Sequence, residues 1–166
     1  MNKWKYALTL VVTQILQATL LSRLPIYSAQ SNLVLAVVVA ISILYGEKWG
    51  AYTGLGLGLL GDIIFADVLG IRALSYFLIG TFVGTVMKNT SRNRMAGVAV
   101  TFAATFFHRF FCWAIALLLR RSISVTWYFV VPLLLEAVLN AVLFLAVLFC
   151  IKQFLKPQTV HKYSGY

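Results

Sequence analysis

Residues 46–74, GEKWGAYTGLGLGLLGDIIFADVLGIRAL, decide the fold of this chain. A glycine stands at every fourth position through its first half: Gly46, Gly50, Gly54 and Gly58. In water each interior glycine destabilises a helix by up to ~1 kcal/mol relative to alanine. In lipid the same spacing clears one face of side chains, so that another helix can approach closely. Asp62 takes the next position of the series, which predicts a tightly packed membrane helix with a carboxylate near its end.

The composition of the whole chain supports a membrane location. The 166 residues are 61% hydrophobic and only 11% charged, and the mean hydropathy is +0.91. Such values lie far from those of soluble domains. Because no Pro/Gly/Ser-rich linker interrupts the chain, we predict one integral-membrane domain, residues 1–166, with an all-α, polytopic, six-helix transmembrane fold.

Six apolar segments predict the spans: residues 5–21, 32–45, 50–65, 71–87, 95–119 and 127–151. The last two exceed the roughly 20 residues that cross a hydrocarbon core. The second and third are short, and we expect a helical hairpin that turns at residues 46–49. The first follows Lys3 and Lys5 like a signal peptide, but it lacks a small-x-small cleavage site, so we expect a retained helix.

The positions of the lysines and arginines predict that both termini are cytoplasmic. With six spans, nine cations lie inside: Lys3, Lys5, Lys48, Lys88, Arg92, Arg94, Lys152, Lys156 and Lys162. Four lie outside: Arg23, Arg72, Arg120 and Arg121. Merging the second and third spans gives five inside and seven outside, which opposes the cytoplasmic preference of these residues.

The net charge of +10 does not indicate a nucleic-acid-binding protein. Such proteins concentrate basic residues on one soluble face, whereas here the cations form short clusters between apolar segments. We expect these clusters to set the topology and to contact anionic membrane lipids.

Two polar features inside the spans require partners. Asp62 could anchor a loop, pair with a cation, bind a substrate, or cap the following turn. Arg109 lies near the middle of the fifth span, where an unpaired guanidinium costs ~2.5–3.5 kcal/mol on insertion scales. Glu136, in the sixth span, is its candidate partner, and we expect the pair to fix helix register. Asn140, one turn later, could extend these hydrogen bonds between helices.

No combination of residues predicts catalysis or a cofactor. His108 and Cys112 share a helix face at the spacing of two metal ligands, but no third ligand is available nearby. The glycines lack the Lys-Ser/Thr that follows them in a phosphate-binding loop. We therefore expect no enzyme activity, no metal and no cofactor. Gly80 and Gly84 form a second small-residue pair that predicts another helix contact.

The order of these features resembles that of MreD, the bacterial rod shape-determining membrane protein family. The resemblance rests on residues 54–62, GLGLGLLGD, followed eight residues after Asp62 by Gly70 within LGIRAL, residues 69–74. Pro132 and Asn140 in the last helix also agree. One departure precedes the second helix, where the family usually has proline beside Asp or Asn and this chain has Gln30-Ser31-Asn32.

The resemblance implies a non-enzymatic scaffold in the bacterial plasma (inner) membrane. MreD-like proteins associate with the single-span MreC, and through it with MreB, RodA and a penicillin-binding transpeptidase in peptidoglycan synthesis for cell elongation. The glycine faces and Gly70 are then candidate contacts, internal or with MreC. The implied fold resembles the substrate-binding subunits of energy-coupling-factor vitamin transporters. This gives an alternative function, small-molecule binding in an outward cavity rimmed by Asp62, Asp67, Arg72 and the loop before Asn32.

Overall fold

All regular secondary structure in the described part of the chain is helical. The computed structural model describes residues 3–21, 31–65, 68–89, 94–119 and 130–155. These residues form six α-helices and one π-helical turn, and no strand: α1 (Lys3–Leu16), η1 (Gln17–Leu21), α2 (Leu33–Tyr45), α3 (Glu47–Phe65), α4 (Ile71–Asn89), α5 (Arg94–Leu118) and α6 (Val130–Leu155). The predicted all-α class is therefore confirmed.

The break between α2 and α3 is narrower than the expected turn at residues 46–49. Only Gly46 separates the two helices. Its φ of +88° lies in the region that side chains disfavour, which explains why glycine stands here. Its N–H donates to the carbonyl oxygen of Ser42 at 2.9 Å and closes the end of α2. Of the predicted sixth span, residues 127–129 lie outside the described part.

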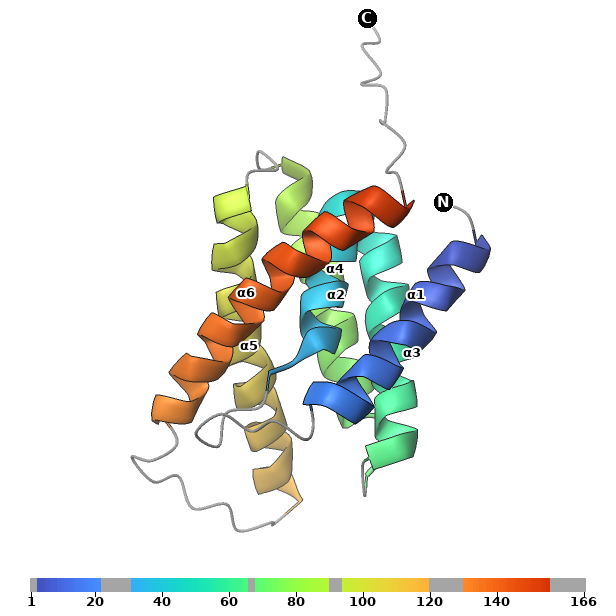
Figure 1. The fold of residues 1–166 in the computed structure, drawn as a ribbon. Coiled ribbons are helices and arrows are strands. Elements are labelled where there is room, and N and C mark those ends of the chain that lie inside the picture. Colours follow the sequence, from blue (N-terminus) through green and yellow to red (C-terminus); the bar gives the residue numbers. More distant parts are fainter. Residues whose placement is uncertain (1–2, 22–30, 66–67, 90–93, 120–129, 156–166) are drawn as a thin grey trace, which may run out of the picture.

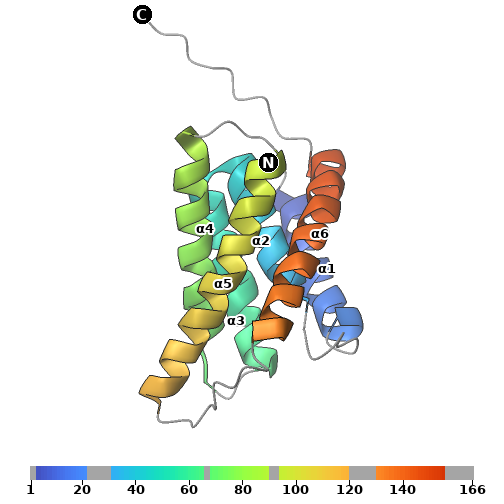
Figure 2. The same ribbon diagram turned by 90° about the vertical axis from the view of Figure 1, so that its left-hand side faces the viewer.

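The central element of the bundle is α2, which lies between the other helices in both views (Figures 1 and 2). Every residue from Leu33 to Leu44 is buried. A helix that is apolar all round belongs in a core, and this one carries no charged residue. Its 13 residues extend only about 20 Å, which is shorter than the ~30 Å hydrocarbon core.

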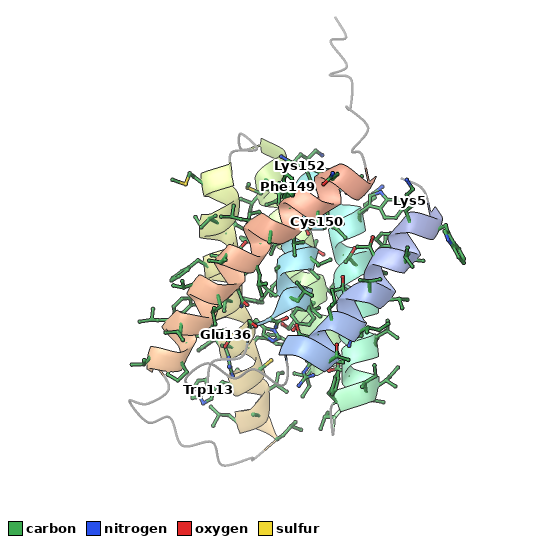
Figure 3. The ribbon with its side chains drawn as sticks, in the orientation of Figure 1. Lys5, Trp113, Glu136, Phe149, Cys150 and Lys152 are labelled. Atoms are coloured by element: carbon green, nitrogen blue, oxygen red, sulfur yellow. The ribbon has the colours of Figure 1, made fainter. Side chains whose placement is uncertain are left out.

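Four lysines lie at one end of the bundle. The first turn of α1 and the last turn of α6 lie at the same end (Figure 1), where Figure 3 shows Lys5 and Lys152. Lys48 and Lys88 belong to the same end, because α3 begins there and α4 ends there. Several cations counted for the topology lie outside the described residues: Arg23, Arg92, Arg120, Arg121, Lys156 and Lys162.

The outer surface of the bundle is suited to lipid. Large apolar side chains such as Ile63, Phe82 and Phe149 are 68%, 72% and 71% exposed. A soluble monomer rarely exposes so much contiguous apolar surface. Within the described residues, three helices are long and apolar enough to cross a membrane, over Ile71–Lys88, Met95–Leu118 and Val131–Gln153.

Candidate functional site

The predicted glycine positions lie inside the bundle, where α3 packs against α4. We call this contact the seam; its glycines are Gly50, Gly54 and Gly58 of α3 and Gly80 and Gly84 of α4. A Cβ built on Gly54 would overlap the carbonyl group of Tyr76 and would lie 2.9 Å from the backbone nitrogen of Phe77. The seam therefore joins two backbones directly, as small residues allow in lipid.

The two ends of the seam show the same close contact. A Cβ on Gly58 would lie 2.7 Å from the backbone nitrogen of Ala73. A Cβ on Gly80 would overlap the carbonyl group of Gly50, and one on Gly84 would overlap the backbone of Glu47. The glycine faces therefore contact each other within the chain, which leaves little of them for another protein.

Asp62 stabilises the start of α4. It is fully buried, and its Oδ2 accepts hydrogen bonds from the backbone N–H groups of Gly70 (2.9 Å) and Ala73 (3.1 Å). Gly70 has a φ of +99°, a conformation that glycine adopts without strain. Among the readings left open by the sequence, the structure thus gives Asp62 a capping contact with the loop before α4.

The two intramembrane charges lie in contact. The Nε of Arg109 on α5 donates to Oε2 of Glu136 on α6 at 2.7 Å, and Nη2 lies 2.6 Å from the same oxygen. The side chain of Glu136 is 4% exposed and that of Arg109 is 33% exposed. The carboxylate of Glu136 is thus enclosed by protein, whereas the side chain of Arg109 is partly exposed.

The start of α2 is held by a polar cluster that the sequence did not predict. The Oδ1 of Asn32 caps Leu35 N–H (3.0 Å), and the Oε1 of Gln17 accepts from Leu33 N–H (2.7 Å). The Nδ2 of Asn32 donates to the hydroxyl of Tyr76 at 2.6 Å. Because a helix leaves its first N–H groups unpaired, these side chains let α2 begin in the interior of the bundle.

Asn140 connects this cluster to two further helices. Its Oδ1 accepts from Asn32 N–H at 2.6 Å, and its Nδ2 donates to the hydroxyl of Thr105 at 3.1 Å. These contacts join α2, α5 and α6, whereas the sequence suggested that Asn140 extends the hydrogen bonding of Glu136. The only sequence signals for the cluster were the isolated amides of Gln17, Asn32 and Asn140 in apolar surroundings.

His108 has structural partners. Its ring stacks on Tyr76 with centroids 4.6 Å apart, and its Nδ1 lies 2.5 Å from the hydroxyl of Ser75. Cys112 Sγ lies 3.9 Å from Nε2 of the same ring, a weak contact. No group of three or more metal-ligating side chains occurs in the part of the chain that the structure describes.

A cavity of about 410 Å³ lies at the end of the bundle away from Lys5 and Lys152. Its wall includes ten polar or charged residues from α1, η1, α3, α4, α5, α6 and the start of α2: Gln14, Gln17, Ser31, Asn32, Asp62, Arg72, His108, Arg109, Cys112 and Glu136. Apolar side chains, including Phe65 and Leu119, complete it. Because the central helix begins only at Leu33, the described residues leave open the space that precedes its first turn.

Two buried acceptors in this wall are unsatisfied. Oε1 of Gln14 and Oδ1 of Asp62 accept no hydrogen bond from any described residue. Gln14 is 6% exposed and Asp62 is fully buried. Buried polar atoms are nearly always hydrogen-bonded to protein or to ordered water, so these two oxygens need donors that the described residues do not provide.

Comparison with models of known protein families identifies the family of this chain. The family model described as rod shape-determining protein MreD matches residues 1–156, nearly the whole chain. The chain belongs to the MreD family. Comparisons with curated proteins and with solved structures give no significant match.

Membership confirms the resemblance seen in the sequence. Members of the MreD family are membrane proteins that determine rod shape. The family consists of structural proteins and is not a known enzyme family. The long apolar helices α4, α5 and α6 agree with that membrane location.

Proposed function

We propose that this chain is a rod shape-determining membrane scaffold that binds MreC. Through MreC it supports the peptidoglycan-synthesising elongation complex, with MreB, RodA and the penicillin-binding transpeptidase as indirect partners. The family match over residues 1–156 carries this proposal. A protein with almost no mass outside the membrane must recognise its partner through helix surfaces, short loops or a recess among the helices.

In this proposal all six α-helices form one bundle in the bacterial inner membrane, with both termini in the cytoplasm. The placement of Lys5, Lys48, Lys88 and Lys152 at one end supports this orientation, because lysines favour the cytoplasmic side. The cavity then opens toward the outer face. These lysines contact anionic lipid headgroups of the inner leaflet.

The cavity is the most suitable contact for MreC. The seam glycines pack against their own chain, and the remaining helix surfaces are apolar like the lipid around them, which gives them little driving force for recognition. The cavity instead offers polar groups, and two of their oxygen atoms accept no hydrogen bond from any residue that the structure describes. Such groups provide specificity in binding sites.

The test is affinity purification of the tagged chain from native membranes, followed by mass spectrometry of proteins and small molecules. We expect MreC among the proteins, and we expect depletion of the chain to give round cells. Absence of MreC under conditions that preserve membrane complexes contradicts the proposal.

The cavity also favours a second candidate, the substrate-binding subunit of a small-molecule transporter. Asp62 and Arg72 line it as this reading requires, while Asp67 lies outside the described residues. The likeness to energy-coupling-factor subunits comes from the family resemblance alone. A vitamin-sized molecule that copurifies in stoichiometric amount, without MreC, supports this alternative.

A further inference from the structure

The cavity wall holds one carboxylate and one guanidinium that form no ion pair with any described residue. Its charged side chains are two carboxylates and two guanidiniums: Asp62, Glu136, Arg72 and Arg109. Arg109 and Glu136 pair with each other, whereas Asp62 and Arg72 form no ion pair, either with each other or with another described residue. A charge enclosed by protein is costly unless an opposite charge lies close to it. The wall is therefore balanced in net charge, but it presents an unpaired anion and an unpaired cation.

The unpaired carboxylate shares its part of the wall with a second free acceptor. Oδ2 of Asp62 accepts from the backbone N–H groups of Gly70 and Ala73, but Oδ1 accepts from no described residue. Oε1 of Gln14 also lacks a donor. A Cβ built on Gly61, the residue before Asp62, would lie 3.4 Å from Nε2 of Gln14, so the amide of Gln14 contacts α3 at the level of Asp62. A primary ammonium group suits these acceptors, because it supplies a positive charge and several N–H donors.

The cavity is continuous with the lipid-facing surface of the bundle. Phe65 and Leu119 line the cavity, and they are also 46% and 47% exposed on the outside. The cavity lies at one end of the bundle, where the headgroups of a bilayer meet its hydrocarbon core. A membrane lipid can therefore place its headgroup among the polar residues of the wall while its acyl chains stay in the bilayer beside Phe65 and Leu119.

We propose that the cavity binds the headgroup of a zwitterionic membrane lipid with a primary ammonium group, as in an ethanolamine phospholipid. The ammonium group donates to Oδ1 of Asp62 and Oε1 of Gln14, and the phosphate pairs with Arg72. A purely anionic headgroup would leave Asp62 unpaired, and a choline headgroup has no N–H donor. This inference goes beyond the proposed function, because it assigns a lipid to the cavity, and MreC then meets the cavity with this lipid in place.

A series of headgroups tests the inference on the unmodified chain. The protein is purified from cells that lack MreC, delipidated in detergent, and titrated with phospholipids of identical acyl chains, with bound lipid measured by native mass spectrometry. The ethanolamine and choline lipids carry the same charges but differ in N–H donors, and a glycerol headgroup is anionic. We expect the ethanolamine lipid to bind on the order of tenfold more tightly than either of the others.

Three results of this series would overturn the inference. These are equal affinity for the ethanolamine and choline lipids, a preference for the anionic lipid, and no lipid binding above that of the detergent, which leaves the cavity to water. None of them affects the proposed function, because MreC is absent from the preparation.

Two variants locate the headgroup within the cavity. Gln14→Leu removes one acceptor and should lower the advantage of the ethanolamine lipid over the choline lipid about fivefold. Arg72→Gln removes the cation that pairs with the phosphate and should weaken binding of the ethanolamine lipid roughly tenfold. Lys88→Gln, in the last turn of the same helix as Arg72, is the matched control and should leave every affinity unchanged. If Arg72→Gln and Lys88→Gln bind the lipid equally well, the headgroup lies elsewhere and the inference is wrong.

Discussion

The seam and the cavity both involve helices α3 and α4, yet they differ in how closely their residues pack. In the seam, glycines bring two backbones into contact and leave no room for a single added carbon atom. In the cavity, a few residues further along, polar side chains line open space and two acceptors have no partner among the described residues. Tight packing fixes a fold, whereas unsatisfied polar groups are retained where something else binds. Substitutions should therefore damage stability at the seam, and at the cavity they should damage stability only where a wall residue has a partner within the chain.

The largest effect is expected in the seam itself. Gly54→Ala places a Cβ against the carbonyl group of Tyr76, so α3 and α4 must separate. We expect destabilisation of about 4 kcal/mol or failure to fold, because backbone atoms cannot move aside as side chains do. Thermal unfolding of the purified protein in detergent measures this.

Gly56→Ala is the control in the same helix, since nothing lies within 4 Å of a Cβ built there. Its stability should be unchanged or raised by up to ~1 kcal/mol. Equal behaviour of the two variants would show that the seam is not packed as described.

The next effect tests the ion pair beside the cavity. Arg109→Gln leaves the enclosed carboxylate of Glu136 without its cation and should cost about 3 kcal/mol. Glu136→Gln should cost less, about 1–2 kcal/mol, because the side chain of Arg109 is a third exposed. Exchanging the two residues, Arg109→Glu with Glu136→Arg, should recover most of the loss in thermal stability. If the exchange recovers nothing, the pairing is wrong.

A smaller loss is expected at the cluster that starts α2. Asn140→Leu removes the acceptor of Asn32 N–H and should destabilise the protein by about 2 kcal/mol, the penalty for a buried donor without a partner. Thr85→Val removes an exposed hydrogen bond to Glu47 at the other end of the bundle and should change stability by less than about 0.5 kcal/mol. Comparable losses in both variants would argue against a structural role for the cluster.

The smallest effect on stability is expected at Arg72. Because no described residue pairs with it, Arg72→Gln should shift the free energy of unfolding by no more than ~0.5 kcal/mol. A large loss of thermal stability in this variant would assign Arg72 to the fold, and the contrast between seam and cavity would disappear.

The sequence predicted the seam better than the cavity, for a physical reason. Glycines at four-residue spacing have a single structural use in lipid, so Gly54 and Gly80 were recognisable from the chain alone. Arg109 and Glu136 were also recognisable, because isolated charges at membrane depth need partners. In each case a local pattern carried the information.

The rest depends on distances between segments far apart in the chain. Thr105, Ser75 and Gln17 are ordinary residues in a helix, and nothing local indicates that they meet the start of α2 or His108. The cavity depends on the shortness of α2. This shortness can be recognised only by comparison with the longer helices around it. The single-residue break at Gly46 was likewise too subtle for the sequence to separate from a four-residue turn.

The shortness of α2 has a consequence for membrane voltage. If both termini face the cytoplasm, water and ions in the cavity approach the first turn of α2 from outside, and the insulating path beneath them is the helix itself, about 20 Å, instead of ~30 Å of hydrocarbon. The transmembrane potential then falls over a thinner layer, and the local electric field rises by about half. Charged groups at the floor of the cavity lie at the edge of that field, so their interactions with an occupant respond to the energised state of the cell.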